Sequence, residues 1–174
     1  MRNMTSILAP AILLANCVVA GAAETAAPSP VKIAVFPFEL VDFSAAVPYV
    51  PADDIDREQL RLSTEEARRL IAASGRYQLV DVSAVKDLAA KAGKLRDCEG
   101  CEARIAAGLN ADQSMIGIVT RITRMEYAVT YKIRDARSGT MVAVEQTDLR
   151  MGANVAWSRG ARWLIENRLL ERVK

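Results

Sequence analysis

The stretch SMIGIVTRITRMEYAVTYKIRDARSGTMVAVEQTDLR, residues 114–150, contains three runs rich in branched and aromatic residues. The first run, residues 114–124, is the most apolar and predicts a central strand, in which Gly117 indicates close packing by a neighbour. The second run, residues 127–134, alternates between an apolar and a mixed face, as an antiparallel strand with one wet side does. The turn DARSG then leads into a partner strand over residues 141–150.

The chain before this stretch begins its folded part with another strand pattern. Residues 31–38, VKIAVFPF, alternate and are rich in branched and aromatic residues, and Pro37 indicates an edge or an end of the strand. Residues 43–56 contain prolines, alanines and aspartates and predict a loop. Its DDID run lacks the alternate ligand spacing and the glycine turn of a calcium loop, which favours a solvated acidic segment.

A long helix is predicted over residues 57–74 and is ended by Gly75. Ser63 and Glu66 have capping-box spacing, so the regular helix is expected to begin only there. The residues expected on its buried face are Leu60, Ala67, Leu70 and Ile71.

The remaining elements complete the predicted fold. A strand is expected over residues 76–82, short helices over residues 84–92 and 102–107, and a final helix over residues 155–170. The final helix should bury Trp157, Ala161, Leu164 and Ile165, with Trp163 beside them, and expose Arg159, Arg162 and Arg168.

This order predicts an α/β (α+β) fold in which helices pack on a mixed five-stranded sheet. The order is strand, helix, strand, two helices, three strands and a helix, in a single domain over residues 31–174. The length is sufficient for one hydrophobic core.

The N-terminal residues 1–23 combine Arg2, an apolar run and small residues, which is typical of a secretory signal peptide. A short disordered tail is expected over residues 24–30. Cys17 resembles a lipidated cysteine only poorly, because Asn16 precedes it and the apolar run continues. We therefore expect a periplasmic protein that is not anchored at Cys17.

The charge of the chain is nearly balanced. The formal net charge is +2, and loss of Arg2 with the signal lowers it to +1. Basic and acidic residues are interspersed, which argues against nucleic acid as a partner. No second apolar run is long enough to span a bilayer, so we expect no membrane insertion of the mature chain.

The sequence contains no histidine, and this excludes the commonest catalytic arrangements. Serine and cysteine mechanisms that use a histidine base are absent, as is attachment of a c-type haem. Structural zinc prefers four cysteine or histidine ligands, and only Cys98 and Cys101 are available. A glycine-rich phosphate loop is also missing. We expect no cofactor, no metal and no enzymatic activity.

Cys98 and Cys101 form a C-x-x-C pair in the segment LRDCEGCE, ahead of a predicted helix. A helix start lowers the pKa of a thiol, but Glu99 and Glu102 oppose that effect. In an oxidising compartment the pair should form a disulfide, and closing so small a loop gains about 2 kcal/mol. A structural bridge is favoured, while a redox-active pair and a metal clip remain alternatives.

Four segments recur in the same order in a broad group of bacterial envelope domains. They are KIAVFPFEL, AASGRYQLVD, AGLNADQSMIGIVTRI and YKIRDARSGTMVA. The chain resembles the amino-terminal domain of TolB, the curli secretion protein CsgG and the lipoprotein activators of penicillin-binding proteins. It is most similar to an uncharacterised secreted bacterial family with an LRDCxGCE motif. The resemblance covers about residues 31–170 and implies a TolB-N-like fold and function through binding other envelope proteins.

We therefore expect a non-enzymatic periplasmic accessory domain that binds a protein partner of the cell envelope. The expected contact surfaces are an exposed edge strand and the loop over residues 43–56, with Tyr49, Asp53 and Asp54 as candidate contacts. One alternative is a thiol–disulfide accessory protein that uses Cys98 and Cys101. Another is a periplasmic domain that binds a small ligand between the sheet and its helices.

Overall fold

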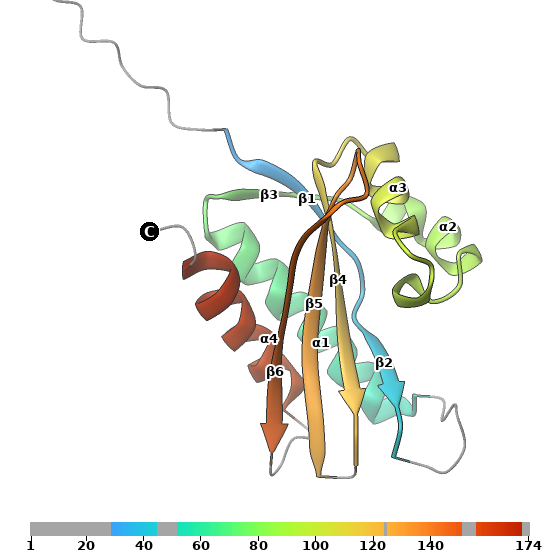
Figure 1. Ribbon diagram of the computed structural model, residues 1–174, viewed down its shortest axis with the longest axis vertical. Coiled ribbons are helices and arrows are strands. Elements are labelled where there is room, and N and C mark those ends of the chain that lie inside the picture. Colours follow the sequence, from blue (N-terminus) through green and yellow to red (C-terminus); the bar gives the residue numbers. More distant parts are fainter. Residues whose placement is uncertain (1–28, 45–51, 124, 151–155, 172–174) are drawn as a thin grey trace, which may run out of the picture.

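The computed structural model describes residues 29–44, 52–123, 125–150 and 156–171. Within these ranges a six-stranded sheet packs with helices, none of which is long and apolar enough to cross a membrane (Figure 1). The strands are β1 (Val31–Val35), β2 (Glu39–Asp42), β3 (Tyr77–Val80), β4 (Gln113–Arg121), β5 (Glu126–Asp135) and β6 (Met141–Arg150). The helices are α1 (Asp54–Ala73), α2 (Lys86–Lys91), α3 (Cys101–Gly108) and α4 (Trp157–Leu164), with 3-10 turns η1 (Ser83–Val85) and η2 (Leu95–Asp97) and the π-helical turn η4 (Ile165–Leu170).

The strand order is β3-β1-β4-β5-β6, with parallel pairing from β3 to β4 and antiparallel pairing from β4 to β6. β1 pairs with the first residues of β4 and β2 pairs with its last residues, so β1 and β2 lie end to end beside the same strand. The predicted mixed architecture and the central position of β4 are confirmed. The prediction of five strands is wrong, because β2 has only four residues and comes directly after a proline-containing break.

The strand predicted over residues 31–38 ends earlier, at Val35, and β2 begins after Pro37, at Glu39. Two side chains one turn apart on α1 satisfy the backbone at this break. The Phe38 N–H donates to Thr64 Oγ1 at 2.9 Å, and Arg68 Nη2 donates to the Val35 carbonyl at 2.6 Å. α1 therefore holds the main chain on both sides of the break.

The Phe38 ring also lies against the bare backbone of Gly117 in β4. A Cβ atom added at Gly117 would lie 2.3 Å from three ring carbons of Phe38, far inside van der Waals contact. The prediction that Gly117 marks close packing is confirmed, since only glycine leaves room for this ring.

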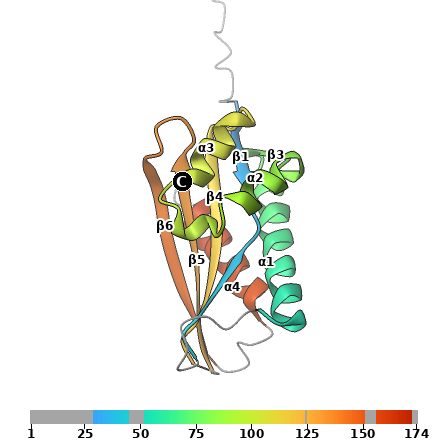
Figure 2. The same ribbon diagram turned by 90° about the vertical axis from the view of Figure 1, so that its right-hand side faces the viewer.

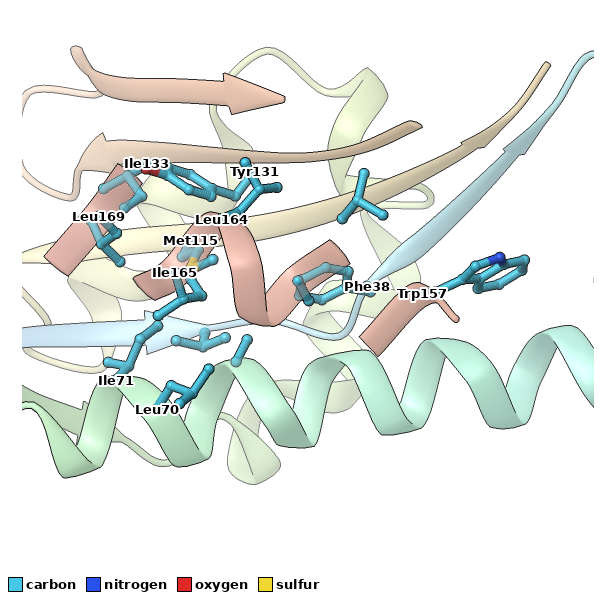
Figure 3. Packing of buried hydrophobic residues seen from close by; sticks show 14 of the residues in the cluster. Phe38, Leu70, Ile71, Met115, Tyr131, Ile133, Trp157, Leu164, Ile165 and Leu169 are labelled. Carbon is cyan, nitrogen blue, oxygen red and sulfur yellow. The ribbon is translucent and has the colours of Figure 1, made fainter. Parts of the chain in front are cut away.

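α1 and α4 cover one face of the sheet and enclose the larger core cluster (Figures 1 and 3). In Figure 3, Leu70 and Ile71 of α1 lie on the side of the core opposite Tyr131 and Ile133 of β5, with Met115 of β4 between them. All five side chains are buried, at the contact between α1, α4 and the sheet. This face is therefore closed by a continuous layer.

α2 and α3 cover the opposite face at one end of the sheet only (Figure 2). Here Phe36, Leu95, Ala106 and Ile116 belong to a second, smaller core cluster. Towards the other end of this face, no described helix covers β2, β4, β5 and β6. The two faces of the sheet are thus protected to different extents.

The start of α1 differs from the prediction. Asp53 caps the helix by accepting the Asp56 N–H at 2.8 Å, while Asp56 accepts the Asp53 N–H at 3.3 Å. The predicted box at Ser63 and Glu66 is wrong, because Ser63 lies buried within the helix and donates to the Gln59 carbonyl at 2.8 Å. The predicted loop therefore extends too far, since residues 54–56 are helical; residues 45–51 lie outside the described residues.

The other expectations for α1 hold. Ala67, Leu70 and Ile71 are buried and Leu60 packs beside them, as the helical spacing predicts. Gly75 follows the helix with φ of 67°, the left-handed conformation that glycine adopts at low cost.

The final helix buries the predicted stripe but not Trp163. Trp157, Ala161, Leu164 and Ile165 are each at most 1% exposed. Trp163 is 42% exposed, and the Arg168 guanidinium lies 5.3 Å from its ring centre. Its predicted burial is wrong, because it lies outside the stripe that contacts the sheet. Arg159, Arg162 and Arg168 are exposed as predicted.

Gly117→Ala should destabilise the fold by about 1–3 kcal/mol, because the added methyl group overlaps the Phe38 ring. Urea unfolding monitored by circular dichroism would measure this loss. Gly108→Ala is the matched control, since nothing lies within 4 Å of its Cβ position. Phe38→Leu should recover part of the loss in the Gly117→Ala background, and equal stability of Gly117→Ala and wild type would disprove the contact.

Candidate functional site

Cys98 and Cys101 lie at disulfide distance in the turn between η2 and α3, with their Cα atoms 5.6 Å apart. Glu99 and Gly100 make this turn with φ of 45° and 97°. Cys101 is 7% exposed and packs in the smaller core cluster with Leu95, while Cys98 is half-buried. Burial of one sulfur favours a bridge that holds the start of α3 over a pair that exchanges with other thiols.

Glu102 lies beside this pair and is 2% exposed. Its carboxylate and the two sulfur atoms lie within 4.8 Å of one another, a spacing that could suit a metal ion. However, sulfur atoms joined to each other do not offer thiolate ligands. The Glu102 carboxylate is also 2.9 Å from Arg134 Nε in β5. The cluster thus fastens α3 to the sheet.

The acidic residues proposed as partner contacts lie at the start of α1. Asp53 is the helix cap described above, which gives its carboxylate a structural role. Asp54 is exposed and pairs with Arg57 on the helix surface. Tyr49 lies outside the described residues. The role of Asp53 as the helix cap is sufficient to explain an aspartate at that position.

A buried charge cluster that the sequence did not predict joins β2, α1 and β4. Arg121 donates to Asp42 at 2.5 Å, to Asp56, and to the Tyr127 hydroxyl at 3.1 Å. Its guanidinium lies 5.5 Å from the Tyr127 ring centre and 5.9 Å from that of Trp157. No local motif could reveal this cluster, because Arg121 is 79 and 65 residues from the two aspartates.

The surroundings of the cluster keep it charged. Burial raises the pKa of Asp42, but hydrogen bonds from Ser44 and Arg121 outweigh this effect and leave the pKa below its ordinary value. Burial lowers the pKa of Arg121, but hydrogen bonds to Asp42, Asp56 and Tyr127 raise it further than burial lowers it. The cluster therefore acts as a fixed ionic clamp between the end of β2 and the first turn of α1.

The uncovered end of the sheet forms a groove of about 690 Å³. Leu40 and Asp42 of β2 belong to its lining. We call the other strand residues of the lining the open face, and these are Val41, Ile118, Thr120, Thr130, Lys132, Val144 and Gln146. Thr130 donates to Gln146 at 3.1 Å across neighbouring strands. Lys132 lies on this face and forms no ion pair with the described residues. The open face thus combines the apolar Val41, Ile118 and Val144 with uncharged polar side chains and one cation, Lys132.

Lys94, just before η2, and Arg96 and Asp97 of η2 form one rim of this groove. Glu39 of β2 fixes the rim by accepting the Leu95 N–H at 2.7 Å and Arg96 Nη1 at 2.9 Å. The Arg96 side chain is buried in this ion pair. Hydrogen bonds and an ion pair therefore hold this rim to the sheet.

β6 is an edge strand, because within the described ranges it pairs only with β5. Its exposed apolar residues include Val142 and Val144, which is 48% exposed. Ile122 and Met125, at the end of the β4–β5 hairpin, are exposed as well, and so is Phe43 after β2. An open edge beside an apolar face is a template for an added strand.

Comparison with known proteins identifies related sequences and folds. The model of the family DUF3280, described as "Protein of unknown function (DUF2380)", matches residues 31–169. No curated protein matches the sequence significantly.

Solved structures share the fold at low sequence identity. The LpoB C-terminal domain from Escherichia coli is 10% identical over 70% of this chain and 83% of that chain, with a TM-score of 0.50. Lipoprotein GNA1162 from Neisseria meningitidis is 16% identical over 72% of this chain and 84% of that chain, with a TM-score of 0.49. TolB from Acinetobacter baumannii is 13% identical over 82% of this chain and 29% of that chain, with a TM-score of 0.43. The match to LpoB shows a common fold.

Arg121→Met should cost about 3 kcal/mol at pH 7, because it leaves two buried carboxylates without their cation. The pKa of Asp42 in the folded protein lies below its ordinary value of 3.8, so its ionised form stabilises the fold at a pH above 3.8. This stabilisation is lost as the pH falls below 3.8 towards the lowered pKa. The difference between variant and wild type should therefore shrink below about pH 4.

Urea unfolding from pH 7 to pH 3 would measure this dependence. Arg61→Met is the control, because Arg61 pairs with Glu58 and Glu65 on the exposed surface of α1 and its loss should leave the stability unchanged. An Arg121→Met variant as stable as wild type at pH 7 would contradict the clamp.

Replacing both Cys98 and Cys101 by serine should lower stability by about 2 kcal/mol, the loop-closure value for so short a loop. The bridge should also have a reduction potential below about −300 mV, as structural disulfides do. Equilibration with thiol redox buffers, followed by alkylation and mass spectrometry, would measure that potential. A potential near those of known oxidants would instead support the thiol–disulfide alternative.

Proposed function

This chain belongs to the family DUF3280, and from its structure we propose that it is a non-enzymatic accessory domain of the bacterial cell envelope that binds a protein partner. The observation that carries the proposal is the open face together with the unpaired edge of β6. Monomeric proteins seldom expose contiguous apolar surface without a use for it.

The occupant that fits this surface is an extended segment of the partner protein. Such a segment would add to the edge of β6 through main-chain hydrogen bonds. Its alternate side chains would then lie beside the exposed Val142 and Val144 of β6, which favour apolar groups. Lys132 favours an acidic residue in the same segment, because it forms no ion pair with the described residues.

The envelope location rests on separate support. Residues 1–23 are expected to direct export, and the bridge between Cys98 and Cys101 suits an oxidising compartment. The resemblance to TolB and to lipoprotein activators, together with the fold shared with the LpoB domain, is consistent with such a location. The absence of histidine from the sequence favours binding over catalysis.

A photo-crosslinking amino acid at Val144 should capture one envelope protein in cells that express the chain from its own promoter. The matched control places the same amino acid at Trp163, an apolar position of similar exposure on α4. The crosslinked peptide of the partner should be extended, with alternating apolar residues and an acidic residue, and Lys132→Glu should reduce its yield.

Two results would contradict this function. One is a crosslink of equal yield from Val144 and Trp163, which would indicate contact without a preferred surface. The other is the absence of any adduct at Val144 while the protein is folded and exported at its normal level.

A further inference from the structure

A second hollow of about 660 Å³ lies on the far side of η2 from the open face. It lies where β3 ends at Val80 and where the line of β1 is interrupted at Phe36 and Pro37. Residues of η1 and α2 complete its wall. β1 and β3 are parallel, so the hollow lies at the carboxyl ends of parallel strands, where open α/β sheets commonly bind ligands.

The size and lining of this hollow are typical of a site for a small molecule. Phe36, Pro37, Leu79, Val82 and Leu95 provide an apolar wall. An apolar wall of this extent favours a ligand with a hydrocarbon or aromatic body, because binding removes both surfaces from water.

Arg68 provides a cation in the lining of the hollow. Its guanidinium is half-buried and donates through Nε and Nη2 to a single acceptor, the Val35 carbonyl, at 3.2 and 2.6 Å. Within the described residues it forms no ion pair, and Nη1 makes no hydrogen bond. A half-buried guanidinium without a paired carboxylate is suited to bind an anionic group.

The other charged residues that line the hollow are Lys86, Asp81 and Glu39. Lys86 on α2 forms no ion pair with the described residues. Asp81 accepts hydrogen bonds from the Ser83 N–H at 2.8 Å and the Ser83 hydroxyl at 2.6 Å, and Glu39 is paired with Arg96. Asp81 therefore opposes both Arg68 and Lys86 without an ion pair to either, and Glu65 of α1 also attracts Arg68.

We propose that this hollow binds a small amphipathic carboxylate, with its apolar body against Phe36, Leu79 and Leu95 and its carboxylate between Arg68 and Lys86. The site is independent of the partner surface, because none of these five residues lies on the open face. It gives chemical content to the expectation of a small ligand between the sheet and its helices.

Titration of the isotope-labelled protein with octanoate, followed by nuclear magnetic resonance, tests this site directly. Octanoate should shift the amide signals of residues 79–86 and of Phe36, while octylamine, with the opposite charge on a similar chain, should not. Lys86→Gln should weaken octanoate binding about threefold, as loss of a partly exposed ion pair does. Lys91→Gln, on the same helix but outside the lining, should leave binding unchanged.

Two further variants separate charge from shape. Arg68→Gln should weaken binding about tenfold or more, as expected for loss of a charge-assisted hydrogen bond. Ala89→Phe should abolish binding by filling the hollow without changing its charge. The folded state of both variants is checked by circular dichroism, because Arg68 also supports the break after β1.

The proposal is overturned if octanoate does not bind, if octylamine binds equally well, or if the shifted signals lie on the open face. It is also overturned if Lys86→Gln and Lys91→Gln have the same affinity as wild type. None of these results affects the crosslinking from Val144, so the ligand site and the proposed function are tested independently.

Discussion

The Phe38 ring packs on the bare backbone of Gly117, and this contact fixes the point at which β1 gives way to β2. Thr64 and Arg68 of α1 satisfy the backbone groups released there. The strand can therefore be interrupted between Val35 and Glu39 and rejoin the same neighbouring strand while the Val35 carbonyl and the Phe38 N–H keep hydrogen-bond partners. The hollow at the ends of the parallel strands and the groove beside β2 both lie next to this break.

The short turn η2 separates these two surfaces. Leu95 lines the hollow, whereas Arg96 lines the groove, and Glu39 of β2 holds the main chain of Leu95 and the side chain of Arg96. The bridge between Cys98 and Cys101 follows within the same segment. The hollow and the groove therefore lie on opposite sides of one anchored segment. This arrangement gives the cysteine pair a structural purpose that needs no redox chemistry.

The sequence predicts most of the regular elements, because their apolar periodicity is strong. The stripe of α1 and the three strands over residues 114–150 are examples, and Gly117 was identified from its position within a strand. β2 could not be predicted from a four-residue pattern next to Pro37. The start of α1 was misplaced because two capping-box spacings lie within one helix, and only packing shows that Ser63 is buried.

The candidate site was less accessible to sequence reasoning than the fold. An exposed edge strand was expected, but which strand it is depends on the pairing order across the whole sheet. The ionic clamp at Arg121 and the unpaired guanidinium of Arg68 arise from contacts between distant segments. A sequence pattern reports neighbours along the chain, so it cannot show which charges meet and which remain alone.

The central claim is that this domain works by offering the edge of β6 and the open face to an extended segment of another protein. Hydrogen–deuterium exchange of the chain in complex with its crosslinked partner tests that claim most directly. The account predicts that amides of β6 gain protection on binding, while those of α1 and α4 keep their exchange rates. Protection confined to α1 and α4, with unchanged exchange along β6, would contradict it.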